Sequence, residues 1–396
     1  MPADHVPQPA RPIPRESSGS HAPRLRVLAM VPYPVGRAPG QRYRIEQWEP
    51  YLRREGVDLT FACFEDESLF ATLERPGRPL QKLLAVLRRI PAQRRWLGLL
   101  GDFDAAFLFR EAMILGPAWI ELGLTAGLPV VYDFDDAIWL ARPNPYNPIA
   151  PLLKFQGKTR TIAARCAAVL AGNEYLAEWA RRVNPATHVV PSTIDTEGSY
   201  AREKSHVQTP RPTIGWSGSR STLQYLAGLR PMLASLARVM DYRLLVVCNG
   251  DPVDWPDVPV EWRPWTSARE VDDLLEMDLG LMPQPDDEWS RGKCGMKALQ
   301  YMALGIPAVV SHSGALPSIV SDGMNGRLVR DDDEWRDALR ALGADTALRA
   351  RLGAAARCTV RERFSAAVQA PRVAAILRSV ARARAGQRAG AASASE

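Results

Sequence analysis

The sequence predicts an α/β protein of two Rossmann-like domains whose parallel sheets face a central cleft. Three observations support this fold. Short apolar runs alternate with segments of helical period from residue 25 to about residue 364, the pattern of parallel βαβ units. A polar, proline-flanked stretch at 202–212 divides this series in two. With 396 residues, 46% of them hydrophobic, the chain exceeds the size at which one core normally splits into two domains.

In the first half, six apolar runs predict strands at the positions given below. A helix is expected from Gln41 to Glu55, with a bend at Pro50, and another from Asn173 to Val183. The predicted strands cover residues 25–33, 58–64, 104–110, 128–135, 167–172 and 187–192.

The second half repeats the alternation. Ser267 and Glu270 have the spacing of a capping box before a helix that reaches Met277. A later helix is expected to end at Gly305, with Pro307 opening the next strand. The predicted strands cover residues 213–218, 243–250, 260–265, 279–283, 307–311 and 326–330.

These elements predict domain boundaries. The first domain is expected at 23–201 and the second at 213–364, joined by a linker at 202–212. A C-terminal helix is expected over 365–385. Proline-rich composition at 1–22 and low complexity at 386–396 predict a disordered leader and tail.

Composition narrows the class of function. The net charge is +6, but 50 basic residues are balanced by 44 acidic ones, and no aromatic-basic platform occurs, so nucleic-acid binding is not expected. The five cysteines are scattered singly, which indicates reduced thiols and a cytoplasmic protein. No apolar run approaches the 18 residues expected of a membrane span.

Residues 81–100 combine leucines with basic residues in a helical pattern. Such a helix either lies on the anionic inner face of a membrane, as a peripheral anchor, or packs on the protein with a solvated basic face. The basic residues are Lys82, Arg88, Arg89, Arg94 and Arg95, with Arg78 just before them.

Two segments of the second half are candidates for phosphate binding. GWSGSRST, at 215–222, follows the first strand; Ser217, Gly218 and Ser219 are expected to leave amides open to a phosphate, and Arg220 adds a cation. The alternative is a plain surface turn.

In RGKCGMKALQ, at 291–300, Lys293, Lys297 and Gln300 share one stripe of a helix near its start. Two cations and an amide there suit an anionic ligand, because backbone N–H groups and the helix dipole favour negative charge. The alternative is a solvated lysine face.

The carboxyl ends of strands in the first half carry further candidates. The loop PYPVGRAPGQRYR, at 32–44, follows the first strand, and Gly40 within it permits close approach of a ligand. Arg110 and Glu111 end the third strand. The run VVYDFDDAIW, at 130–139, ends its strand in Asp133, Asp135 and Asp136, an acceptor-side or catalytic cluster, or else an exposed acidic loop.

Taken together, these segments resemble the retaining glycosyltransferases of family 4, which have the GT-B fold of two Rossmann-like domains. The resemblance extends from Leu25 to about Phe364. The matching segments are VGRAPGQRYR, LPVVYDFDDAIW, GNEYLAEW, VVPSTID, TIGWSGSRST, GKCGMKALQYMALGIPAVVS and SDGMNGRLV.

The resemblance implies a nucleotide-sugar donor held by the second domain, a glycan or lipid-linked acceptor, and no resident cofactor or metal. The donor site so implied comprises Gly40, Ser217, Gly218, Ser219, Arg220, Lys293, Lys297 and Gln300. Arg220 and Lys297 would stabilise the charge on the departing nucleotide, and Asp135 is a candidate base. Arg110, Glu111, Asp133 and Asp136 are expected on the acceptor side.

The chain departs from the family pattern at two positions. The family commonly carries two glutamates separated by seven residues, and the alignment places Gly292 and Gln300 at these positions. Gln300 can still exchange hydrogen bonds with a ribose. Two alternatives therefore stay open: a non-catalytic module that binds a nucleotide sugar, and a nucleotide-sugar epimerase of the same architecture.

Overall fold

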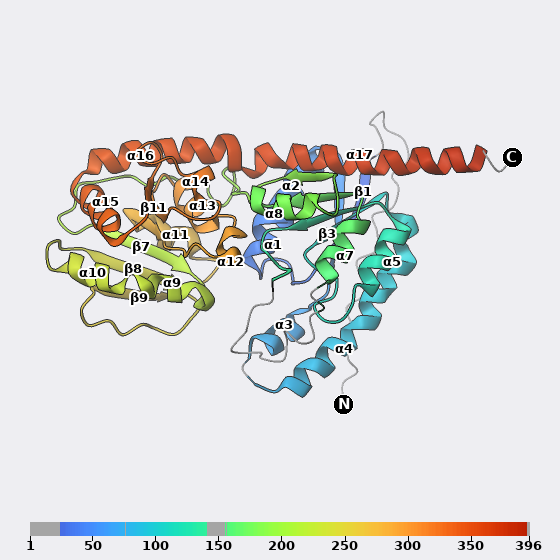
Figure 1. Ribbon diagram of the computed structural model, residues 1–396, viewed down its shortest axis with the longest axis horizontal. Coiled ribbons are helices and arrows are strands. Elements are labelled where there is room, and N and C mark those ends of the chain that lie inside the picture. Colours follow the sequence, from blue (N-terminus) through green and yellow to red (C-terminus); the bar gives the residue numbers. More distant parts are fainter. Residues whose placement is uncertain (1–23, 76, 141–154, 156, 394–396) are drawn as a thin grey trace.

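The protein consists of two α/β domains, each built on a parallel six-stranded sheet, as the sequence predicts (Figure 1). The structure is a computed structural model that describes residues 24–75, 77–140, 155 and 157–393. The leader predicted at 1–22 lies outside these residues. None of the described helices is long and apolar enough to cross a membrane.

The first sheet has the order β2-β1-β3-β4-β5-β6, with every neighbouring pair parallel. Alternate residues of its strands face opposite sides, as a period of two requires. Its strands are β1 (Leu25–Val31), β2 (Val57–Cys63), β3 (Ala105–Phe109), β4 (Val130–Phe134), β5 (Ala168–Ala171) and β6 (Thr187–Val189).

Helices cover both faces of this sheet. Val27 and Ala29 of β1 pack toward α2 and α17, and Leu28 and Met30 pack toward the helices of the other face. The elements of the first domain are α1 (Pro39–Gln41), η1 (Arg42–Glu46), α2 (Gln47–Arg54), α3 (Glu67–Glu74), α4 (Pro79–Arg95), η2 (Trp96–Asp102), α5 (Trp119–Gly127), α7 (Lys158–Arg165) and α8 (Glu174–Arg181).

The second sheet has the order β12-β11-β10-β7-β8-β9 and is also parallel throughout. The short stretch at 202–212 carries no helix or strand, and Lys204 within it binds the second domain through Asp278. The strands are β7 (Thr213–Gly218), β8 (Arg243–Cys248), β9 (Val260–Pro264), β10 (Leu279–Met282), β11 (Ala308–Ser311) and β12 (Arg327–Val329).

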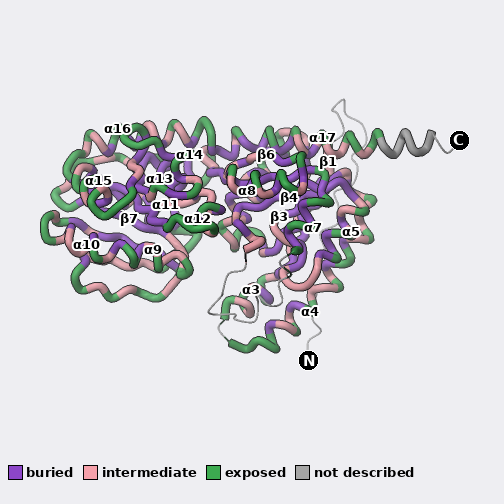
Figure 2. The backbone as a smooth tube through the Cα atoms, in the orientation of Figure 1, coloured by how far each residue is buried: buried purple, intermediate pink, exposed green. Residues whose placement is uncertain are grey.

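Helices again cover both faces, so the inner strands of both sheets are buried, whereas the edge strands β2, β6, β9 and β12 are only partly buried (Figure 2). The last helix, α17, leaves the second domain and runs along the first (Figure 1). The helices are η3 (Arg220–Thr222), α9 (Leu223–Gly228), α10 (Arg230–Ala237), α11 (Glu270–Leu275), α12 (Glu288–Arg291), α13 (Met296–Ala303), α14 (Leu316–Ile319), α15 (Asp332–Ala344), α16 (Thr346–Thr359), η4 (Val360–Phe364) and α17 (Ala366–Ser393).

Three local predictions can be compared with these elements. The bend expected at Pro50 was wrong, because the chain departs from helical geometry at Arg44 (φ −113°, ψ −105°), six residues earlier. The capping box was also wrong, because α11 begins without a side-chain cap and the carboxylate of Glu270 binds other partners. Gly305 does end α13, with a φ of +72° that suits glycine.

Candidate functional site

Lys297 occupies the first turn of α13, close to the end of β7. Its half-buried ammonium group lies 5.3 Å from the centre of the Trp216 ring and donates to Oγ1 of Thr222 at 3.3 Å. Among the described residues, no carboxylate forms an ion pair with it. Burial, and after it the charge of Lys293, lowers the pKa of Lys297 to about 8. The charge of this lysine is therefore left without an anionic partner by the part of the chain that the structure describes.

Gly218 explains how Lys297 fits beside Trp216. A Cβ at this position would lie 2.4 Å from the Trp216 ring and 2.9 Å from Cε of Lys297. The side chains of Lys297 and Trp216 therefore occupy the space that any larger residue would need. Gly218 therefore leaves room for the side chain of Lys297.

The amides of the loop after β7 differ from the prediction. The N–H of Ser217 donates to the hydroxyl of Tyr301 at 2.8 Å, and the N–H of Ser219 donates to Oγ1 of Thr222 at 3.1 Å. These two amides are not open, because side chains of the same domain already use them. Arg220 is exposed and forms an ion pair of 3.0 Å with the exposed Asp251. Arg220 thus remains accessible to an anion.

Lys293 faces the first domain. Its ammonium group lies 3.0 Å from Oδ1 of Asp136, whose other oxygen accepts from Arg110 at 2.7 Å. Burial acts to raise the pKa of Asp136, but Lys293 and Arg110 together lower it below its usual value. Of the two lysines predicted to bind phosphate, Lys293 is therefore neutralised by a carboxylate of the other domain.

Arg110 forms ion pairs with two of the predicted aspartates, Asp135 and Asp136. Its Nε donates to Oδ1 of Asp135 at 2.7 Å, and its backbone is left-handed, with a φ of +55°. Such a backbone is strained for a residue other than glycine, and its ion pairs with Asp135 and Asp136 hold it. Gly40 lies against this group, because a Cβ there would come within 2.8 Å of Oδ2 of Asp135. Arg110, Asp135, Asp136 and Gly40 therefore lie together, although Gly40 was expected with the donor-binding residues.

Asp133 and Glu111 lie apart from this site. Asp133 is fully buried and forms a two-pronged ion pair with the equally buried Arg44, with 3.0 Å between Nε and Oδ2. Its predicted acceptor-side role is not supported, since its carboxylate has no exposed surface. The carboxylate of Glu111 lies 3.6 Å from Lys158, which is itself 2.9 Å from Glu121. Glu111 thus belongs to a charge cluster separate from Arg110.

The two domains meet through the loop that precedes α13. The side-chain amide of Asn173 donates to the carbonyls of Arg291 and Lys293, each at 3.1 Å. Gly292 packs on the first domain, because a Cβ there would lie 2.7 Å from Cβ of Ala137. The carboxyl edges of the two sheets thus face each other, which brings Lys293 to the predicted aspartates.

Gln300 lies in a polar group that the sequence did not reveal, called here the hinge cluster. Its buried side-chain amide donates to the hydroxyls of Tyr43 at 2.7 Å and Tyr200 at 2.6 Å. The cluster is completed by Glu270 and Arg42, which pair at 3.0 Å. Nothing in the spacing of positions 42, 43, 200, 270 and 300 indicates this contact, because the fold alone brings them together.

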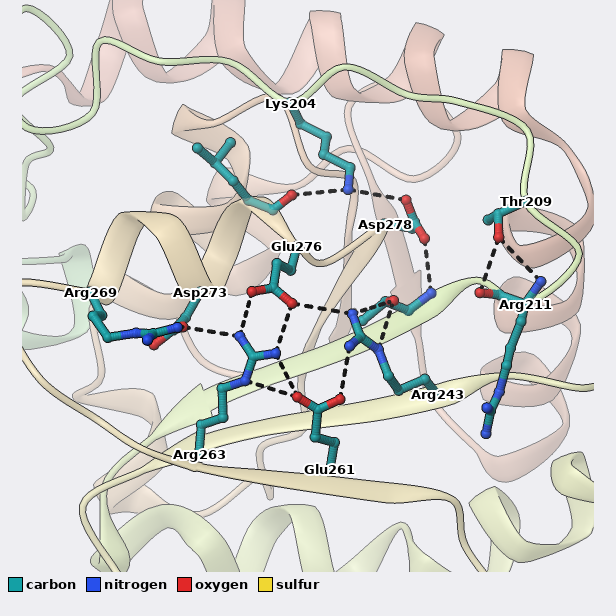
Figure 3. A network of polar contacts seen from close by, with 12 residues as sticks. Lys204, Thr209, Arg211, Arg243, Glu261, Arg263, Arg269, Asp273, Glu276 and Asp278 are labelled. Carbon is teal, nitrogen blue, oxygen red and sulfur yellow. Dashed lines mark hydrogen bonds and ion pairs between the residues drawn. The ribbon is translucent and has the colours of Figure 1, made fainter.

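A second network fixes α11, the helix that carries Glu270 (Figure 3). Arg263 of β9 donates to Glu276 at 2.8 Å and to Asp273 at 3.1 Å. Arg243 of β8 adds a contact of 2.8 Å with Glu261, which also binds Arg263. These ion pairs tie α11 to the sheet, so that its first residue points toward Arg42.

Comparison with known proteins agrees with this architecture. Residues 211–345 match the family model described as Glycosyl transferases group 1. Two relatives are both named D-inositol 3-phosphate glycosyltransferase. The protein from Xylanimonas cellulosilytica is 28% identical over 242 residues, which cover 52% of this chain and 55% of the relative. The protein from Corynebacterium jeikeium is 41% identical over 205 residues, which cover 44% of this chain and 45% of the relative. The chain thus spans about half the length of the relatives it matches.

Solved structures with similar folds cover nearly the whole chain. Sucrose-phosphate synthase from Thermosynechococcus elongatus has a TM-score of 0.68 at 16% identity, covering 91% of this chain and all of that one. Alr3699/HepE of Anabaena, in complex with UDP and glucose, has a TM-score of 0.62 at 15% identity, covering 90% of this chain and all of that one. At these identities the likeness shows the fold alone, and that fold is GT-B.

Proposed function

We propose that this protein is a glycosyltransferase that moves a sugar from a nucleotide-sugar donor to a glycan or lipid-linked acceptor, with retention of the anomeric configuration. The observation that carries the proposal is Lys297. It is a half-buried cation without a carboxylate partner among the described residues, at the carboxyl edge of the second sheet. Ligands of doubly wound folds bind at this edge, and a diphosphate supplies the anion that Lys297 lacks.

The comparisons support a donor site in the second domain. The matched range 211–345 contains Arg220, Lys293 and Lys297. The relatives are named as glycosyltransferases, and one structure of the same fold was solved with UDP and glucose. A uridine nucleotide sugar is therefore the first donor to test.

The proposed chemistry is stabilisation of the leaving group. Negative charge grows on the diphosphate as the glycosidic bond to the nucleotide breaks, and in this proposal Lys297 and Arg220 offset it. In a retaining reaction the departing phosphate can take the proton of the acceptor hydroxyl. Asp135 is the alternative base, although Arg110 already holds its Oδ1. We propose that this chemistry requires no metal.

Donor binding is tested by thermal unfolding with UDP, GDP, ADP and CMP sugars. A ligand at one hundred times its Kd stabilises the folded state by about 2.7 kcal/mol, so the correct donor raises the melting temperature and the others do not. If none of the four nucleotide classes shifts the melting curve, the proposed donor site is wrong.

Turnover separates a transferase from the two alternatives. Lys297→Ala is expected to reduce transfer roughly 100-fold, the scale seen when one charge-stabilising group is removed from a transition state. The matched control is Arg230→Ala, which removes an exposed cation paired with Asp257 on the same domain. A binding module would show no turnover in the unaltered protein, and an epimerase would convert the donor without any acceptor.

A further inference from the structure

Tyr43 belongs to the first domain by sequence, but its side chain lies in the core of the second. It is only 1% exposed and packs in the cluster that contains Leu299 and Met302 of α13. Its carbonyl oxygen accepts from the N–H of Thr193, in the segment where the chain leaves the first domain. The first domain thus contributes Tyr43 to the core of the second at the hinge, together with Ile194 and Tyr200 from its last residues.

The hydroxyls at this hinge form a chain of hydrogen bonds with one direction. Tyr43 has a single hydroxyl proton, which it donates to Oε2 of Glu270 at 3.0 Å. Tyr200 lies 3.0 Å from the same hydroxyl and must therefore donate to it. Gln300 uses its two amide protons on these two oxygens. The protons run from the amide of Gln300, through the tyrosines, to the carboxylate of Glu270.

The two hydroxyls in the middle of this chain and the carboxylate at its acceptor end both have defined partners. Burial raises the pKa of Tyr43 well above its ordinary value and that of Tyr200 also, so both hydroxyls keep their protons. At the acceptor end, Glu270 also accepts from Arg42 at 3.0 Å and from the indole of Trp265 at 3.1 Å. The cluster therefore holds one buried carboxylate balanced by one guanidinium.

We infer that Gln300 and Glu270 are positioning residues that fix the angle between the two domains, through a hydrogen-bond chain that needs an amide at one end and one carboxylate at the other. The inference rests on the proposed function, because it assigns a consequence for transfer. Lys297 lies one turn before Gln300 on α13. Holding Gln300 on Tyr43 therefore sets where Lys297 stands relative to Asp135 and Asp136.

The direction of the chain predicts that Gln300→Glu is harmful, although the family resemblance places a glutamate there. Two carboxylates would then compete for two hydroxyl protons. If each tyrosine donates outward, the two hydroxyl oxygens 3.0 Å apart have no proton between them. The change also buries a second negative charge beside a single guanidinium. We expect Gln300→Glu to reduce turnover about tenfold or more, by misplacing the domains.

Exchanging the residue types at the two ends of the hydrogen-bond chain should restore the turnover that Gln300→Glu loses. In the double variant Glu270→Gln with Gln300→Glu, the amide stands at one end and the carboxylate at the other, so the proton count is again complete. Turnover and melting temperature are expected to recover partly, since Arg42 now lacks its carboxylate. Gln208→Glu, an exposed change at an acceptor for Thr346, is the control and should match the unaltered protein.

The readouts separate positioning from direct contact with the donor. We expect Gln300→Glu to change small-angle X-ray scattering and lower turnover while the donor Kd, measured by calorimetry, stays within about threefold of that of the unaltered protein. A large loss or gain of donor affinity without a change in scattering would mean that Gln300 contacts the donor directly, and overturns the inference. Equal activity of Gln300→Glu and the unaltered protein, or a double variant no better than the single one, overturns it as well.

Two provisions keep the test independent of other failures. If Gln300→Glu does not fold, Tyr43→Phe removes the proton given to Glu270 while keeping the ring, and the same loss of turnover at constant donor Kd is expected. Should the unaltered protein show no transfer with any donor, the proposed function fails. In that case, the scattering curves and melting temperatures of the single, double and control variants, each compared with the unaltered protein, still show whether the hinge cluster sets the domain angle.

Discussion

Lys293 and Lys297 stand four residues apart on the same stretch of sequence, but the fold gives them different partners. Lys293 is paired with Asp136 of the other domain, and Lys297 faces only a ring and a hydroxyl among the described residues. A helical stripe predicts that both point the same way, and it cannot predict that one of them meets a carboxylate 157 positions earlier. The difference determines which lysine is available to a phosphate.

The lowered pKa of Lys297 predicts a pH dependence of donor binding. A diphosphate favours the charged lysine, so binding raises its pKa above the value of about 8 in the free protein. Below pH 8 the lysine is charged in both states and contributes no dependence. As pH rises above 8, the free protein loses the proton that the complex keeps, so donor affinity should fall by up to about tenfold per pH unit.

Calorimetry across pH 6.5 to about 9.5 measures this dependence. Lys297→Arg supplies a cation that keeps its charge over the whole range, and its donor affinity should be nearly independent of pH. If the unaltered protein and Lys297→Arg show the same dependence, Lys297 does not bind the diphosphate.

At the scale of single elements, α4 presents an apolar stripe to solvent. Leu80, Leu84 and Leu87 are spaced at one-turn intervals and are exposed to 76%, 55% and 48%. Two of the basic residues predicted in this region point inward, since Lys82 donates to the carbonyl of Leu73 and Arg89 to that of Phe64. Four others remain exposed around the stripe: Arg78, Arg88, Arg94 and Arg95. We propose that this face binds an anionic lipid surface.

Vesicle sedimentation tests this proposal. Binding to vesicles of anionic phosphatidylglycerol is expected, with little binding to neutral phosphatidylcholine, and Leu84→Glu should reduce it several-fold. Leu122→Glu, a change at a partly exposed leucine of α5, is the matched control. Unchanged sedimentation of Leu84→Glu would leave α4 as a packed helix with a solvated basic face.

Most elements could be predicted because their signals are local. The twelve described strands all lie within predicted apolar runs or overlap them, since burial on both faces requires continuous hydrophobic residues. The bend and the cap were missed for a different reason. Arg44 leaves helical geometry where it binds Asp133, and Glu270 binds Arg42, so distant partners override the local preference of each residue.

The candidate site was only partly predictable. Strand ends predicted Arg110, Asp135 and Asp136 at a common edge, since parallel strands end there, but not that Arg110 binds both aspartates. Neither the buried pair of Arg44 and Asp133 nor the hinge cluster could be predicted, because each depends on residues from separate segments meeting in three dimensions.

At the scale of the whole molecule, the junction of the domains depends on Gly292. Any side chain there meets Ala137 of the first domain at 2.7 Å, which excludes in this arrangement the glutamate that the family resemblance places at this position. Gly292→Ala is therefore expected to push the domains apart. Turnover should fall roughly tenfold, while the donor Kd, a property of the second domain, stays nearly constant.

Gly228→Ala is the control for this prediction, because a Cβ at position 228 meets nothing within 4 Å. Steady-state kinetics and calorimetry on both variants measure the two quantities. Full turnover of Gly292→Ala would show that the contact with Ala137 is not needed for transfer.

Helix α17 gives the chain an unusual order of assembly. Ala370, Val373 and Leu377 complete the core on one face of the first sheet, although the strands of that sheet end near residue 189. During synthesis, the first domain emerges from the ribosome with this face covered only in part, by α2, and the rest stays uncovered until the whole second domain has followed. The first half to be made is therefore the last to close, and its exposed apolar face is where a chaperone would be needed.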